Sequence, residues 1–351
     1  MSDVLWLIPA LPALGFVLLV LFGRRLGEPL SGWLATAMVG GSFVVTLATF
    51  VDLLSKEAEE RRLTQTLFTW VPAGNFKVGL GLLADPLSVT MLLFVTGVGA
   101  FIHMYSIGYM KGDKDFSKFF LYLNLFILSM ITLVLGDNLL VTFLGWEGVG
   151  LCSYFLISFW FDDPDNATAG KKAFVTNRVG DWGYMVAMFL TWTVVGSLNY
   201  VDIDAKASTI SSVTATALVL LFFVAATGKS AQLPLFVWLP DAMRGPTPVS
   251  ALIHAATMVT SGVYLLVRLN PVLQQAGWAN DVIAWVGGIT ALVAATTAVA
   301  RTTSRRSSRT RPSASSASCS WRSARAATSL RSSTWSPTPS SRRCSSWARA
   351  R

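Results

Sequence analysis

Hydrophobic runs of about twenty residues recur along the chain and alternate with short polar stretches. The hydrocarbon core of a bilayer is about 30 Å thick, which an α-helix of about 20 residues can cross. The pattern predicts about nine spans, namely Val4–Phe22, Trp33–Leu54, Pro86–Met110, Phe119–Leu135, Leu139–Phe161, Ala173–Val195, a seventh beginning at Val213, Thr247–Leu269 and Asp281–Ala300. We therefore expect an all-α fold, a polytopic transmembrane helical bundle.

Two stretches depart from this helical pattern. Thr64–Leu83 alternates apolar and polar residues around a turn at Pro72 and Gly74, which predicts an extracytoplasmic β-hairpin. Beyond Gly228, Pro234 and Pro240 each lack a backbone amide donor and disfavour the helical turn before them. We therefore expect the seventh helix to be broken.

The composition supports a membrane protein. The 351 residues are 53% hydrophobic and only 13% charged, whereas soluble domains carry about 25% charged residues. The formal net charge of +9 is misleading, because residues 301–351 hold 12 Arg and no acidic residue or Lys. The other 300 residues carry 16 basic and 19 acidic side chains. The three cysteines, Cys152, Cys319 and Cys344, form neither a disulfide framework nor a zinc-binding pattern.

The segment 301–351 has two interpretations. The first is a disordered basic tail that contacts nucleic acid or anionic lipid. The second is an out-of-frame translation of a GC-rich gene. Synonymous codons shifted back by one base convert 332–348 into IFHLVTHAFFKALLFLG, an apolar helix, and 303–319 into DIKKVLAYSTISQIGFM. We favour the out-of-frame interpretation, under which nucleic acid is not expected to be a partner. Sequencing the DNA around codon 300 would test it.

Basic residues indicate an orientation for the bundle. Cytoplasmic loops carry an excess of Lys and Arg. With the N-terminus outside, one set of basic residues falls on a single side: Arg24, Arg25, Lys111, Lys114, Lys118, Lys171, Lys172 and Arg244. The basic residues of the opposite loops are diluted by acidic neighbours. We therefore predict an N-outside topology.

Lys229 is the first candidate for chemistry, because an ionisable group at membrane depth is costly and usually marks an ion or substrate path. The stretch Ala226–Ser230 resembles the end of a phosphate-binding loop, but Phe223 stands where that motif needs glycine. The lysine also adjoins the predicted helix break, whose free backbone groups must line a wet cavity or be buried in protein. We therefore expect a proton-exchanging lysine.

Four further ionisable residues lie in apolar runs. Glu147 is either a carboxylate satisfied by a basic neighbour or a protonatable group that pairs with Lys229. Asp181 is either a relay member or a simple partner of Arg178. An imidazole can pass protons or can simply form hydrogen bonds in a protein core. His254, one span after Lys229, is interpreted as a relay histidine, and His103 as a structural one. The expected proton-relay set is thus Lys229, Glu147, His254 and Asp181.

Four stretches closely resemble the L-subunit family of the bacterial proton-translocating NADH–quinone oxidoreductase (respiratory complex I), a family of antiporter-like subunits. They are HMYSIGYM (103–110), NLLVTFLGWEGVGLCSYFLISFW (138–160), AFVTNRVGDWGYM (173–185) and GKSAQLPLFVWLPDAMRGPTPVSALIHAATMVTSGVYLLVRL (228–269). The chain departs from the family pattern at two positions: Phe236 stands in place of a histidine and Arg244 in place of a glutamate.

The resemblance implies an antiporter-like fold of which only the first repeat is encoded, with Lys229, Glu147 and His254 in a proton half-channel. It divides the chain into N-terminal helices with the hairpin (1–84), the proton-channel bundle (85–300) and the tail (301–351). It also implies a multi-pass protein of the bacterial inner membrane whose partners are the lipid bilayer and membrane-arm subunits, above all the M-type subunit. NADH, FMN, iron–sulfur clusters and quinone would be used in other subunits, with no cofactor or metal bound here.

Two alternatives remain open at this stage. The chain could be a subunit of a sodium/proton antiporter, which the GWEGVG stretch disfavours. It could also be a non-functional truncated product, which would fail to assemble with its partners.

Overall fold

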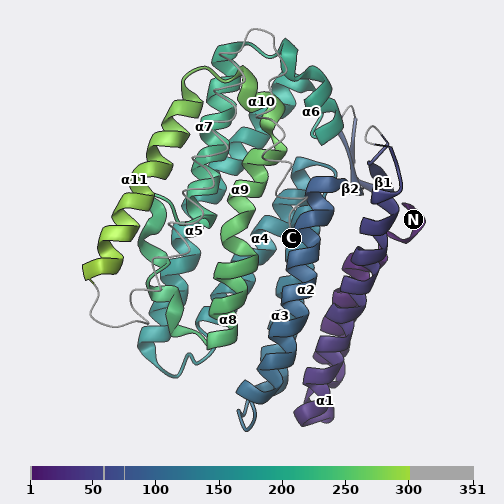
Figure 1. The fold of residues 1–351 in the computed structure, drawn as a ribbon, viewed down its shortest axis with the longest axis vertical. Coiled ribbons are helices and arrows are strands. Elements are labelled where there is room, and N and C mark those ends of the chain that lie inside the picture. The colour runs from purple at the N-terminus through teal and green to yellow at the C-terminus, as the bar shows by residue number, and fades with distance from the viewer. Residues whose placement is uncertain (1, 58–59, 75, 301–351) are drawn as a thin grey trace.

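The computed structural model describes residues 2–57, 60–74 and 76–300, and the predicted tail lies outside these ranges. The longer helices are α1 (Leu7–Leu54), α2 (Pro86–Tyr109), α3 (Phe116–Leu135), α4 (Leu139–Ile157), α5 (Pro164–Val195), α7 (Ser212–Lys229), α9 (Met258–Arg268) and α11 (Ala279–Ala300). The shorter ones are α6 (Tyr200–Lys206), α8 (Thr247–Ala251) and α10 (Asn270–Gln275). Figure 1 shows a helical bundle with α1 at one edge and α11 at the other.

Seven helices of the described chain are long and apolar enough to cross a membrane. This number differs from the nine predicted spans for two reasons. The first two predicted spans both fall in α1, which counts once although it consists of two helices joined at the non-helical residues Gly27 and Glu28. The two helices fold back on each other, and the Ser42 hydroxyl donates to the carbonyl of Ile8 at 2.8 Å. The sixth predicted span falls in α5, which carries several charges and is not among the seven. The protein is nevertheless a multi-pass membrane protein.

The predicted hairpin is present. Strands β1 (Leu63–Ala73) and β2 (Phe76–Ala84) pair antiparallel, and Gly74 adopts a positive φ of 58° at the turn. Because β2 ends one residue before Asp85, that aspartate caps α2: its Oδ1 accepts a hydrogen bond from the Ser88 amide at 2.9 Å. The hairpin therefore lies at the end of the bundle where α2 begins (Figure 1).

Helix α3 is the central element of the first half of the bundle and packs against α1, α2 and α4. Gly145 of α4 faces the backbone of Leu133 and Ser129, where a Cβ atom would collide. The small residue thus permits the close approach of α3 and α4. Helices α5 and α7 pack together in the second half, with α9 against α7.

The seventh helix is broken as predicted. Helix α7 ends at Lys229, and short 3₁₀ turns follow, η3 (Leu235–Trp238) and η4 (Asp241–Arg244). The next predicted span is also interrupted, which the sequence analysis missed: α8 leads into a π-helical segment, η5 (Leu252–Ala256), before α9. Thr257, at the junction, has φ −135° and ψ −86°. No proline or glycine marks this break, so the hydrophobic pattern concealed it.

Candidate functional site

Lys229 is buried at the end of α7, with only 1% of its side chain exposed. Its Nζ lies 3.6 Å from Oδ1 of Asp181, which is buried on α5. The ring centroid of Trp146 is 5.8 Å from the same nitrogen. No hydrogen-bond acceptor within the described part of the chain contacts Nζ. The ammonium group therefore depends on one carboxylate and one aromatic face for its stabilisation.

Asp181 is oriented by Trp146 as well as by the lysine. The indole Nε1 of Trp146 donates a hydrogen bond of 2.7 Å to Oδ1, the oxygen that also faces Lys229. One carboxylate oxygen therefore joins α4, α5 and α7. Sequence reasoning missed the role of Trp146, although its position next to Glu147 was a signal.

The pairing of charges differs from the sequence-based expectation. Glu147 was expected to pair with Lys229, and Arg178 was considered as the partner of Asp181. Instead, Glu147 forms an ion pair with Arg178, and Asp181 lies next to Lys229. The reason is helix geometry: Arg178 sits on the flank of α5 next to α4, with 45% of its side chain exposed, whereas Asp181 faces the buried α7.

Glycines make room for this arrangement. A Cβ atom at Gly150 of α4 would lie 2.7 Å from Nζ of Lys229. A Cβ atom at Gly180 would lie 3.1 Å from the Cα atom of Gly228, so these two glycines bring α5 and α7 into close contact. The absence of side chains at these three positions thus places the lysine between α4 and α5.

His254 lies in the π-helical segment η5 and is 7% exposed. Neither of its ring nitrogens has a hydrogen-bond partner among the described residues. Its ring packs against Trp238 with centroids 6.2 Å apart, and Nε1 of Trp238 donates to the carbonyl of Gly228 at 3.0 Å. Trp238 therefore connects the histidine to the residue before Lys229.

The remaining positions singled out from the sequence lie away from this site. His103 is buried in α2, where its Nδ1 is 2.8 Å from the carbonyl oxygen of Gly99, in keeping with the structural role expected for it. Arg244, one of the two departures from the family pattern, pairs with Asp165 at 2.8 Å on the surface. Across the described ranges no group of three or more His, Cys, Asp or Glu could hold a metal ion.

Comparison with known proteins identifies this arrangement of helices. Residues 136–307 match a family described as "NADH:quinone oxidoreductase/Mrp antiporter, TM". Residues 70–120 match a family described as "NADH-Ubiquinone oxidoreductase (complex I), chain 5 N-terminus". The first match contains all four predicted relay residues.

Individual relatives agree with these matches. NADH-quinone oxidoreductase subunit L of Mycobacterium tuberculosis is 49% identical over 290 residues, which are 83% of this chain and 46% of that protein. The protein of the same name from Escherichia coli is 46% identical over 295 residues, 83% of this chain and 48% of that protein. The chain thus spans about half the length of these curated relatives.

A solved structure extends the likeness to three dimensions. A chain of the Mrp complex from Dietzia superposes with a TM-score of 0.79 and 28% sequence identity, covering 90% of this chain and 34% of that one. The chain therefore belongs to the family of antiporter-like membrane subunits that includes the L subunits of NADH:quinone oxidoreductases.

Proposed function

We propose that this chain is a proton-translocating membrane subunit of an NADH:quinone oxidoreductase. The observation that carries the proposal is the buried Lys229–Asp181 pair, in which the ammonium has no hydrogen-bond acceptor among the described residues. A buried ammonium group is strongly destabilised when its partner carboxylate is removed. The subunit L relatives, with 46–49% identity, support the assignment to this type of complex.

Proton transfer would follow from a change in the Lys229–Asp181 distance. At 3.6 Å the carboxylate offsets the cost of burying the ammonium group. If Asp181 moved away, the charged form of Lys229 would lose its main stabilisation and the lysine would release its proton. Return of the carboxylate would favour uptake of the next proton. The pair would thus act as a proton switch.

The Glu147–Arg178 pair would couple this switch to its surroundings. Arg178 is partly exposed, and it lies three residues before Asp181 on α5. Glu147 directly follows Trp146, which hydrogen-bonds to Asp181. A charge displaced in a neighbouring subunit would act on Arg178 first. The resulting shift of Glu147 would then alter the position of Trp146 and Asp181.

His254 would receive or supply the proton on the other side of Lys229. Both of its ring nitrogens are buried and have no protein partner in the described structure, so either can bind a proton or a water molecule. No direct hydrogen bond or ion pair joins it to Lys229 within the described residues, so transfer would require an intervening water. Trp238 would keep the histidine oriented toward the broken end of α7.

The redox chemistry would belong to other subunits. NADH, FMN, iron–sulfur clusters and quinone would bind elsewhere in the complex, and this chain would hold none of them. Its partners would be membrane-arm subunits, especially the M-type subunit, in the bacterial inner membrane. The subunit L relatives support membership of an NADH-quinone oxidoreductase, and the other assignments follow from the family resemblance. The chain would thus be a component of an enzyme without a redox centre of its own.

Inverted membrane vesicles that contain the assembled complex test the proposal. NADH-driven acidification of the vesicle interior is followed with a pH-sensitive dye, and a native gel checks that the chain has assembled. Lys229→Ala should abolish most of the acidification while assembly is retained, whereas Lys111→Ala, a substitution in an exposed loop, should leave it unchanged. Full acidification with Lys229→Ala would refute the proposal. Failure of the unmodified chain to assemble would instead indicate a non-functional truncated product.

A sodium/proton antiporter subunit is the second candidate, favoured by the likeness to the Mrp complex. Vesicles that lack NADH dehydrogenase activity distinguish the two. A sodium gradient that drives proton movement in them through Lys229 would support the antiporter. The proposed function requires NADH oxidation and is independent of sodium.

A further inference from the structure

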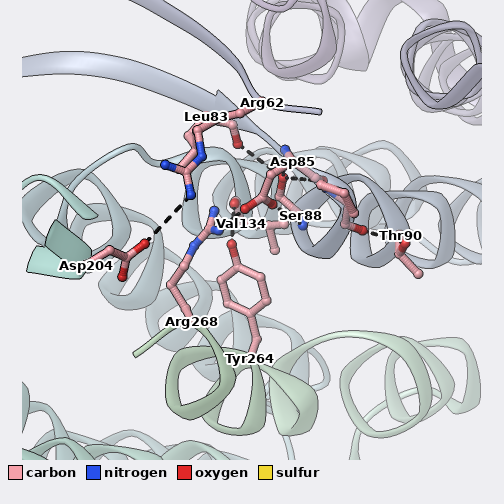
Figure 2. A network of polar contacts seen from close by, with 10 residues as sticks. Arg62, Leu83, Asp85, Ser88, Thr90, Val134, Asp204, Tyr264 and Arg268 are labelled. Carbon is pink, nitrogen blue, oxygen red and sulfur yellow. Dashed lines mark hydrogen bonds and ion pairs between the residues drawn. The ribbon is translucent and has the colours of Figure 1, made fainter. Parts of the chain in front are cut away.

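A second buried ion pair lies at the hairpin end of the bundle, away from the Lys229 site. Arg268, the last residue of α9, pairs with Asp85, the capping residue of α2, and the two side chains are only 6% and 12% exposed (Figure 2). Nε and Nη2 of Arg268 are buried without a hydrogen-bond partner in the described residues. The cation is therefore only partly neutralised.

Two aromatic rings lie against the guanidinium of Arg268. The ring centroids of Tyr200 and Tyr264 lie 5.2 Å and 5.7 Å from its central carbon. The hydroxyl of Tyr264 donates to the carbonyl of Val134 at 2.7 Å, which fixes this ring at the end of α3 (Figure 2). The buried guanidinium of Arg268 is thus held by the two rings and by Asp85 in the cap of α2.

Buried polar side chains form a file between the two ion pairs. Trp146 hydrogen-bonds to Asp181 and packs against Tyr184, with ring centroids 5.4 Å apart. The hydroxyl of Tyr184 donates to the carbonyl of Leu139 at 3.0 Å. The hydroxyl of Tyr200 in turn donates to Thr142 at 2.9 Å. Hydroxyl groups can relay protons, so the hydroxyls of Tyr184, Thr142 and Tyr200, with water between them, would offer an escape path from the Lys229 site.

We propose that Arg268, fixed by Asp85, is an electrostatic barrier that closes the hairpin side of the Lys229 site to protons. The proposal rests on the proton-translocating function above. A guanidinium does not release its proton in a protein, so it cannot pass one on. A fixed arginine in a polar pathway also repels protons and other cations. The barrier thus makes access to Lys229 one-sided, which pumping requires.

The charges can be removed together while the packing is largely kept. Arg268→Gln alone would leave Asp85 buried and unpaired, which is strongly destabilising. Combining Arg268→Gln with Asp85→Asn removes both charges, and asparagine remains a good helix cap. A second charge-free pair, Arg268→Met with Asp85→Ser, retains an alternative cap should the first pair fold poorly.

Passive proton entry measures the barrier. The 351-residue chain is reconstituted into liposomes loaded with a pH-sensitive dye, and a potassium diffusion potential drives protons inward without NADH or partner subunits. Either folded charge-free pair should raise proton entry at least about tenfold, a barrier decrease of ~1.4 kcal/mol. Arg268→Lys keeps the cation and should keep entry low. The partly exposed pair Arg62–Asp204, whose side chains are 45% and 33% exposed and 3.8 Å apart at the same end, is the control. Its removal by Arg62→Gln and Asp204→Asn should have no effect (Figure 2).

Adding Lys229→Ala to the double variant that lacks both charges tests whether the protons enter through the Lys229 site. Proton entry should then return to the level of the unmodified chain. Unchanged entry in a charge-free pair that melts normally would overturn the barrier and make Arg268 a structural tie only. Fast entry that persists with Lys229→Ala would also overturn it, because the leak would bypass the site. Since the assay uses no NADH, its outcome is separate from that of the pumping experiment.

Discussion

Lys229 and Asp181 depend on each other for burial, because both side chains are almost completely buried and their charged groups lie 3.6 Å apart. Removing one partner of a buried pair typically costs about 3–5 kcal/mol, whereas removing both costs far less. We therefore predict that Lys229→Met and Asp181→Asn each lower the free energy of unfolding by several kcal/mol. The double variant should recover most of this loss, as measured by thermal unfolding in detergent.

A second mutant cycle provides the comparison. Lys229→Met combined with Glu147→Gln should show a much smaller interaction energy, because Glu147 pairs with Arg178. Equal interaction energies in the two cycles would mean that the lysine is shared between both carboxylates and would contradict the pairing described above.

Gly150 gives a second prediction at this scale. A Cβ atom there would lie 2.7 Å from Nζ of Lys229 and displace the ammonium from its position. Gly150→Ala should therefore reduce NADH-driven proton pumping several-fold without preventing assembly. Gly108→Ala is the control, because a Cβ atom at that α2 position meets no atom within 4 Å. Equal pumping by both variants would show that the lysine does not need this space.

The identity of the ionisable residues was predictable, but their pairing was not. Lys229, Asp181, Glu147 and His254 stand out because charges are rare in apolar runs. Which carboxylate meets the lysine depends on how α4, α5 and α7 rotate against one another. Contacts such as that of Gly180 with Gly228 set this rotation, and they join residues far apart in the sequence.

At the scale of helices and loops, the break after α7 was predictable because proline causes it, whereas the π-helical segment η5 was not. The residues of η5 include no proline or glycine, so the sequence carries no local signal for the interruption. Thr257 donates its hydroxyl hydrogen to the carbonyl of Leu252 at 2.6 Å, five residues back, which stabilises the widened turn. A helix break of this kind can be recognised only in the tertiary structure.

The link between α3 and α4 gives a pH-dependent prediction. Burial raises the pKa of Asp137 to about 6, above its ordinary value of 3.8. The folded state therefore binds this proton more tightly than the unfolded state. The stability that protonation contributes is complete below pH ~4 and is lost as the pH rises through about 6.

Asp137→Asn should remove this dependence. The variant should be more stable than the unmodified chain above pH ~6, by at most about 3 kcal/mol, and equally stable near pH 4. Thermal unfolding measured from pH 4 to 8 provides the check. A variant that is less stable at pH 8 would show that the carboxylate is needed in its charged form, for example as the acceptor for Nδ2 of Asn138 at 2.6 Å.

At the scale of the whole molecule, basic residues gather at one end of the bundle. The ion pairs Lys114–Asp162, Lys172–Asp241 and Arg244–Asp165 connect the loops there. The hairpin and the first residues of α2 lie at the opposite end (Figure 1). Lys114, Lys172 and Arg244 thus lie at one end of the bundle, in agreement with the single-side grouping of basic residues expected from the sequence.

Labelling of single cysteines from outside the cell tests the resulting topology. In a background with Cys152, Cys319 and Cys344 replaced by serine, Thr69→Cys places a thiol on the exposed hairpin and Lys111→Cys places one at the basic end. Because basic loops are retained in the cytoplasm, a membrane-impermeant maleimide applied to intact cells should label position 69 and spare position 111. Permeabilised cells should be labelled at both positions, which shows that both thiols are reactive. The reverse pattern in intact cells would invert the bundle, so that the Arg268 barrier would face the cytoplasm and the open side of the Lys229 site would face outward.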